Sequence, residues 1–108
     1  MTKMPKLIKQ QGTMGMLANV PEDKVFWCND GRVFKNMREL SDCLASMTEE
    51  TYAYHANAKK NDFANWVRDV IKDDDLAKNI SKATNRVQAA RVIANRIATL
   101  EHKLKTTK

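Results

Sequence analysis

The sequence lacks the patterns on which most enzyme and metal sites are built. Its two cysteines, Cys28 and Cys43, are too few for a disulfide framework, and their C-x14-C spacing matches no zinc module. His55 and His102 would complete a metal-ligand set only if the fold gathered all four side chains. There is no glycine-rich phosphate loop and no nucleophile constellation. We therefore expect a non-enzymatic protein with no metal and no other cofactor.

Long apolar runs are missing as well. No stretch approaches the roughly 18 apolar residues of a membrane span, and the start, MTKMPKLIKQQGTMG, lacks the apolar region of a signal peptide. We expect a cytoplasmic protein without a membrane span. At 108 residues, with 43% hydrophobic and 30% charged side chains, the chain fits one small globular domain.

Acidic residues are scarce in the last third of the chain. Residues 76–108 carry eight basic side chains and one acidic side chain, whereas residues 25–75 carry seven basic and ten acidic ones. Such an excess of one sign is self-repelling unless it meets an anionic partner. The partner can be nucleic acid, an anionic membrane surface, an acidic protein face or the acidic middle of the same chain.

The positions of proline, glycine and turn-forming residues divide the sequence into three parts. Residues 1–24 hold both prolines and two of the three glycines without a sustained helical or strand period, which predicts a flexible basic arm. Residues 25–104 should form a single helical domain, followed by a tail at 105–108. At its start, VFWC and RVF flank the turn sequence Asn29-Asp30-Gly31, which predicts a short β-hairpin.

Three short helices are expected after the hairpin. Asn36 with Glu39 three residues on forms a capping box, and Thr48 is a second N-cap for a helix over about 49–56. Asn61 or Asp62 can cap the third helix, whose apolar stripe is strictly helical in spacing. The residues of that stripe, which we assign to the core, are Phe63, Trp66, Val67, Val70 and Ile71.

A long helix is predicted to run from near Leu76, with Asp75 as its cap, to about Leu104, because no glycine or proline interrupts it. Its apolar residues are spaced alternately three and four positions apart, at Ile80, Ala83, Val87, Ala90, Ala94 and Ile97. On an ideal helix its cations gather within roughly 100° of arc. These residues are Lys78, Lys82, Arg86, Arg96 and Lys103. The fold class is thus mainly α: a short hairpin, three short helices and a long C-terminal helix.

A distinctive pattern covers about half of the chain: F-x-x-x-D-G-x-x-x-x-N-x-x-E-L, then Y-x-Y-H, then K-N-D-F-x-x-W-V-x-D-V and D-x-L-A. This pattern resembles that of an uncharacterised family of small archaeal and bacterial domains. The resemblance implies a shared fold and carries no activity over. Neither the arm nor the basic last helix belongs to the matched pattern, so a specific role can lie in them.

For several residues the sequence allows either a structural or a functional role. His55, Asn61 and Asp62 could form an acid/base site, but without a nucleophile a structural polar cluster is favoured. Trp66 lies within the apolar stripe and is assigned to the core. Trp27, on a hairpin with one open face, can serve either packing or recognition.

The charge pattern favours binding to nucleic acid or a ribonucleoprotein through the arm and the last helix, because phosphate contacts need long cations on one rigid side. The candidate residues are Lys3, Lys6, Lys9, Lys78, Lys82, Arg86, Arg91, Arg96 and Lys103. One alternative is a protein-interaction or homo-oligomeric assembly module that uses the Ala-rich apolar positions of the last helix. A small enzyme or ligand sensor around His55 is the third hypothesis.

Overall fold

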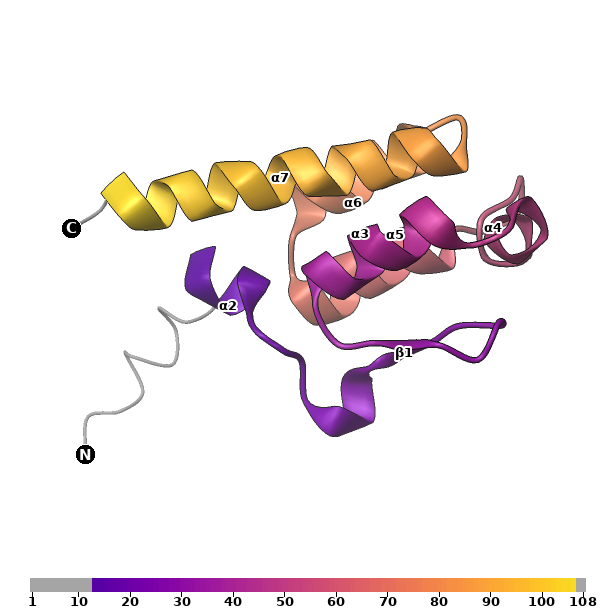
Figure 1. Ribbon diagram of the computed structural model, residues 1–108, viewed down its shortest axis with the longest axis horizontal. Coiled ribbons are helices and arrows are strands. Elements are labelled where there is room, and N and C mark those ends of the chain that lie inside the picture. Colours follow the sequence, from indigo (N-terminus) through magenta and orange to yellow (C-terminus); the bar gives the residue numbers. More distant parts are fainter. Residues whose placement is uncertain (1–12, 107–108) are drawn as a thin grey trace.

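The computed structural model describes residues 13–106 and is mainly helical, as the sequence predicted (Figure 1). In chain order the elements are α2 (Thr13–Leu17), η1 (Glu22–Lys24), β1 (Phe26–Trp27), β2 (Val33–Phe34), α3 (Met37–Ser46), α4 (Glu49–His55), α5 (Asp62–Trp66), η2 (Val67–Ile71), α6 (Asp74–Lys82) and α7 (Arg86–Thr106). No helix among these is long and apolar enough to cross a membrane.

The predicted hairpin is confirmed. β1 and β2 pair antiparallel, with Phe26 opposite Phe34 and Trp27 opposite Val33. Gly31 has a φ of +96°, a backbone conformation that favours glycine, which is why the Asn-Asp-Gly sequence closes the turn. Because side chains alternate along a strand, the two phenylalanines face the core and the other pair faces outward.

Local capping chemistry places the short helices where the sequence predicted them. The Asn36 side chain accepts from the backbone N–H of Glu39 at 2.8 Å, and Thr48 does the same for Thr51 at 3.1 Å. Asn61, rather than the neighbouring Asp62, caps α5 by accepting from the N–H of Ala64 at 3.0 Å. Each cap satisfies a backbone donor that the first helical turn leaves without a partner.

The predicted single helix over 76–104 is wrong. The chain leaves helical conformation at Ala83, and Asp73, rather than Asp75, caps α6. A new capping arrangement starts α7: Asn85 accepts from the N–H of Gln88 at 2.7 Å, and the Gln88 side chain accepts from the N–H of Thr84 at 2.6 Å.

The break has a physical reason. A straight helix would carry much of its apolar surface away from the domain, whereas the turn lets α6 and α7 pack against each other. Leu76 and Ile80 of α6 and Ile93 and Leu100 of α7 are thereby buried in one core. Burying apolar area is the main favourable term in folding, and it prevails over continued helix propensity.

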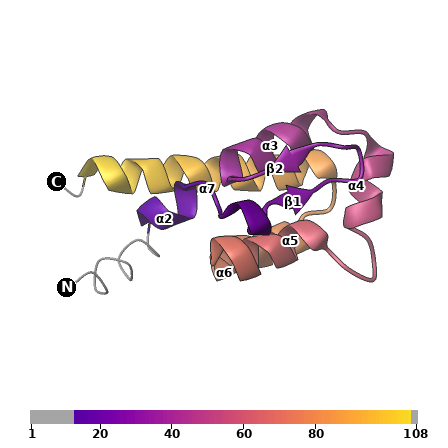
Figure 2. The same ribbon diagram turned by 90° about the horizontal axis from the view of Figure 1, so that it is seen from below.

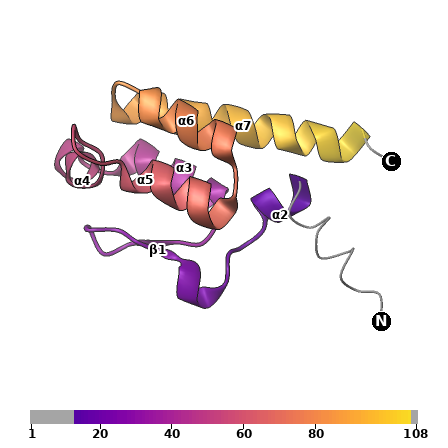
Figure 3. The ribbon, with the colours of Figure 1, turned by 180° about the vertical axis from the view of Figure 1, so that it is seen from behind.

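The elements form layers around this core. In Figures 1 and 3 the hairpin and α7 lie on opposite sides, with α3 and α5 between them. α7 packs back along α3 and also contacts α2 and α6. Figure 2, seen from below, shows the hairpin between α3 and α5 in projection. The apolar side of α7 is therefore part of the domain core.

The part of the predicted flexible arm that the structure describes is docked on the domain. α2 packs against α7 and α3, and Met16, Leu17 and Val20 are partly buried against the core. The N–H of Val20 donates to the carbonyl of Lys35 at 2.8 Å. α7 likewise extends to Thr106, beyond the predicted domain end at 104. Lys3, Lys6 and Lys9 lie outside the described residues.

Candidate nucleic-acid interface

The cations predicted to line one helix are distributed over two. Lys78 and Lys82 lie on α6, whereas Arg91 and Lys103 lie on α7, and all four are exposed. The turn between the helices abolishes the single 100° arc that an unbroken helix would have given. The two remaining arginines of the predicted set, Arg86 and Arg96, have structural partners.

Arg86 is tied to the end of α3. Its Nη1 donates to the carbonyl oxygens of Leu44 at 2.7 Å and Ala45 at 2.9 Å, and its Nε donates to Glu49 Oε2 at 3.1 Å. The last carbonyls of a helix have no partner within the helix, so a cation placed there both satisfies them and complements the helix dipole. Arg86 therefore fixes the start of α7 on α3 and α4.

Arg96 is tied to Asp73 in the interior. Its Nε donates to Asp73 Oδ2 at 2.7 Å and its Nη2 to Oδ1 at 3.3 Å. Asp73 is only 2% exposed and also accepts from the N–H of Leu76 as the cap of α6. One carboxylate thus joins α7 to the first turn of α6, and the charge of Arg96 is neutralised inside the fold.

Beyond these internal pairs, the exposed charges from Leu76 onward are mostly positive, whereas the first turn of α6 exposes Asp74 and Asp75. Glu101, the single acid among residues 76–106, forms an ion pair with Arg38 on α3. The exposed cations of this segment include Lys78, Lys82, Arg91 and Lys105. Lys105 lies in the stretch predicted to be a tail, but α7 extends to Thr106 and so includes it. We define these four residues as the basic surface.

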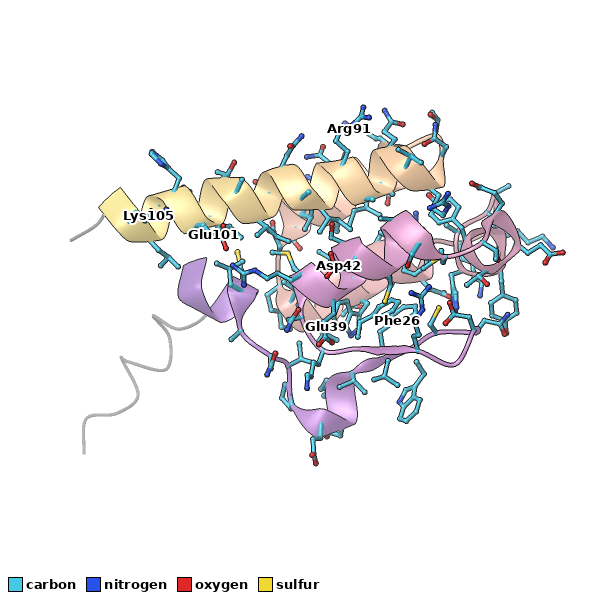
Figure 4. All side chains as sticks on the ribbon, in the orientation of Figure 1. Phe26, Glu39, Asp42, Arg91, Glu101 and Lys105 are labelled. Atoms are coloured by element: carbon cyan, nitrogen blue, oxygen red, sulfur yellow. The ribbon has the colours of Figure 1, made fainter. Side chains whose placement is uncertain are left out.

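α7 gives the basic surface its length. Arg91 and Lys105 are fourteen residues apart on one helix, which at 1.5 Å per residue corresponds to about 21 Å. Figure 4 shows the two residues at well-separated positions along α7 and Glu101 on the side toward α2. Asn95 and Thr99 are exposed between them as neutral hydrogen-bonding groups. The arrangement can hold phosphates along a line.

The predicted polar cluster around His55 is built into the fold. His55 is 4% exposed; its Nε2 accepts from the N–H of Asn29, and its Nδ1 bonds to Asp62 Oδ2, both at 2.9 Å. Asn61 serves as the helix cap instead of joining this pair. Both ring nitrogens are therefore used in hydrogen bonds that connect the hairpin to α5.

Asp62 is held as a carboxylate by its neighbours. Its partial burial by itself would raise its pKa, but hydrogen bonds from His55 and from Lys60, whose Nζ lies at 3.0 Å, outweigh burial and lower the pKa. Because the pKa of Asp62 is lower in the folded state than in the unfolded state, its ionisation stabilises the fold at pH values above the unfolded-state pKa. This stabilisation is lost as the pH falls through the folded-state pKa of Asp62.

We expect Asp62→Ala to lower the free energy of unfolding by about 1 to 3 kcal/mol, because the buried N–H of His55 loses its acceptor. Asp62→Asn keeps an acceptor oxygen and should cost less than about 1 kcal/mol. Urea denaturation of both variants checks the expected order. Equal losses would mean that the charge, rather than the hydrogen bond to His55, stabilises the cluster.

No group of three or more His, Cys, Asp or Glu side chains within residues 13–106 is arranged to hold a metal ion. The two thiols, Cys28 and Cys43, are unpaired, and burial raises the pKa of both. A raised pKa keeps a thiol protonated and lowers its reactivity as a nucleophile. The surroundings of these two cysteines therefore disfavour a role as nucleophiles.

Trp27 is the aromatic residue for which the sequence left packing and recognition open. Its side chain is 75% exposed, so it is not used for packing within the described chain. Trp66, in contrast, is buried as its spacing predicted.

Comparison of the chain with protein-family models, with curated proteins and with solved structures gave no match. The resemblance to small archaeal and bacterial domains therefore stays a prediction.

Proposed function

We propose that this protein is a non-enzymatic nucleic-acid-binding protein that contacts phosphates through the basic surface of α6 and α7. The observation that supports the proposal is the excess of positive charge outside the internal pairs: Lys78, Lys82, Arg91 and Lys105 are exposed, and Glu101, the one acid of residues 76–106, is paired with Arg38. A surface with an excess of positive charge attracts polyanions over several ångströms and raises their association rate.

The dimensions of α7 suit this role. Double-stranded DNA advances about 3.4 Å per phosphate along each strand, so the 21 Å, or about six base pairs, between Arg91 and Lys105 spans several phosphates. Contacts from lysine and arginine side chains to phosphates fix position without reading base identity. Binding should therefore be weakly selective for sequence and strongly dependent on salt.

The packing of α7 weakens the assembly hypothesis. That hypothesis needs the apolar positions of the last helix to be available to a partner helix, but Ala90 is buried and Ile97 partly buried against the domain core. The apolar positions that remain exposed on α7, such as Val87 and Ala94, are separated by Arg91. A helix face interrupted by a cation is a poor seam for a coiled coil.

We expect a fluorescein-labelled 20-base-pair DNA or RNA duplex to bind at 50 mM salt, with log affinity falling linearly against log salt. Each phosphate contact contributes about 0.9 to that slope. Exchanging Lys82, Arg91 and Lys105 for glutamine should reduce the slope by about 2 to 3, since up to three contacts are lost. Fluorescence anisotropy at several salt concentrations measures both quantities.

The matched control removes the same number of charges elsewhere. Lys24, Lys59 and Lys72 are exposed and lie outside α6 and α7, so their exchange for glutamine changes the net charge equally. The control variant should keep nearly the whole slope. No binding at 50 mM salt, or an equal loss of slope in both variants, would contradict a binding site on α6 and α7.

A further inference from the structure

The outward face of the hairpin carries an apolar pair that the fold does not use. Trp27 is 75% and Val33 39% exposed, and the two are directly opposite each other across the strands. Phe26 and Phe34, on the inward face of the same strands, are buried and stack on each other with ring centroids 5.1 Å apart. The inward face of the hairpin is therefore anchored in the core, and its outward face presents the indole of Trp27 to solvent.

Polar contacts fix the hairpin at its turn. His55 accepts from the N–H of Asn29 at 2.9 Å, and Arg32 donates to Ser46 Oγ of α3 at 2.8 Å. Arg32 also bonds to Asp30, and these hydrogen bonds lower the pKa of Asp30 to about 2. Because the backbone of Trp27 is held at both the turn and the core, little conformational freedom is lost when a ligand stacks on the indole.

The size and charge of this face indicate what it can bind. A stable protein interface buries about 800 Å² on each side, whereas one exposed tryptophan supplies at most about 150 to 250 Å². A single planar group is the better fit. Lys35, one residue past β2, is exposed and by strand alternation shares the face of Val33. A ligand that combines a flat ring with a nearby anionic group would stack on Trp27 and place its charge near Lys35.

We propose that Trp27 stacks on an unpaired base of a single-stranded nucleic acid whose phosphates are held by the basic surface. The proposal rests on the proposed function and adds the class of nucleic acid. Stacking on aromatic side chains, combined with cations that follow the backbone, is the physical basis of single-strand binding.

The arrangement of the two surfaces favours a flexible strand. The hairpin and α7 lie on opposite sides of a molecule whose extents are 48 × 29 × 21 Å (Figures 1 and 3). DNA duplex has a persistence length of about 150 base pairs and cannot bend around so small a body at low cost. A single strand of 20 nucleotides reaches about 70 Å even at 3.4 Å per nucleotide, and it can contact both sides.

The experiment compares a 20-nucleotide thymidine strand with an abasic strand of the same length, which keeps the phosphates and lacks the bases. We expect Trp27→Ala to weaken binding of the thymidine strand by about 5-fold to 100-fold, the range that loss of one stacked base produces. Its affinity for the abasic strand should equal that of the wild type. Trp27→Phe keeps an aromatic face and should restore part of the lost affinity.

The outcomes separate the two proposals. If the wild type binds both strands and Trp27→Ala leaves the thymidine strand unaffected, stacking is wrong while phosphate binding stands. If Trp27→Ala weakens both strands equally, the loss is independent of the bases, and stacking is again overturned. If the wild type binds neither strand at 50 mM salt, phosphate binding by the basic surface fails and the stacking proposal falls with it.

Discussion

Replacing Trp66 with alanine is expected to lower the free energy of unfolding by about 3 to 5 kcal/mol. The indole is 7% exposed and meets the ring of Phe26 edge-on, with centroids 6.0 Å apart. Its Nε1–H donates to the carbonyl of Lys24 at 2.8 Å, which ties η1 to α5. The substitution therefore creates a cavity and also releases the segment that leads from α2 to the hairpin.

Chemical denaturation of the variant measures this loss. A small domain has about 5 to 15 kcal/mol of total stability, so the transition should move to much lower urea concentration. Trp27→Ala is the matched control, because it removes the same side chain from an exposed position and should change stability by less than about 0.5 kcal/mol. A Trp66→Ala protein that unfolds like the wild type but binds nucleic acid poorly would identify Trp66 as a recognition residue.

Replacing Arg96 with methionine is expected to cost about 3 to 5 kcal/mol, although methionine keeps most of the length of the side chain. The reason is the partner left behind: Asp73 is 2% exposed and would retain an uncompensated charge in the interior. Because Asp73 also caps α6, weakening its position should loosen the contact between α6 and α7. Salt should change this loss little, since buried pairs are poorly screened.

Arg91→Gln provides the comparison for Arg96. Both arginines lie on α7, but Arg91 is exposed, so its exchange should leave the melting temperature unchanged and reduce nucleic-acid binding. Arg96→Met should show the reverse order of effects, with a large loss of stability. An Arg96→Met protein as stable as the wild type but defective in binding would restore Arg96 to the interface that the sequence predicted for it.

Local sequence signals predicted most of the first two thirds of the fold. Asn36, Thr48 and Asn61 cap helices because a short polar side chain at such a position bonds to a backbone N–H two or three residues away. Gly31 closes the hairpin for a similarly local reason. These interactions depend on neighbours in the chain, and so they can be recognised without knowing the rest of the structure.

The last third was predicted less well, because two local interpretations competed. The absence of glycine and proline over 76–104 favoured one helix, but Asn85 with Gln88 is also a capping signal. Helix propensity alone does not choose between them. The choice is made by the buried area gained when α6 turns back along α7, a quantity that depends on contacts between distant segments.

The sequence by itself determined the mainly helical class, the hairpin, the caps and the excess of positive charge in the last third, since each follows from composition or from neighbouring residues. Only the tertiary structure decided which cations remain on the surface. Arg86 and Arg96 meet partners 37 and 23 residues away, in Glu49 and Asp73, and these pairings exist only after the helices have packed. The exposure of Trp27 was decided in the same way, because whether a strand face is covered depends on elements that lie far from it along the chain.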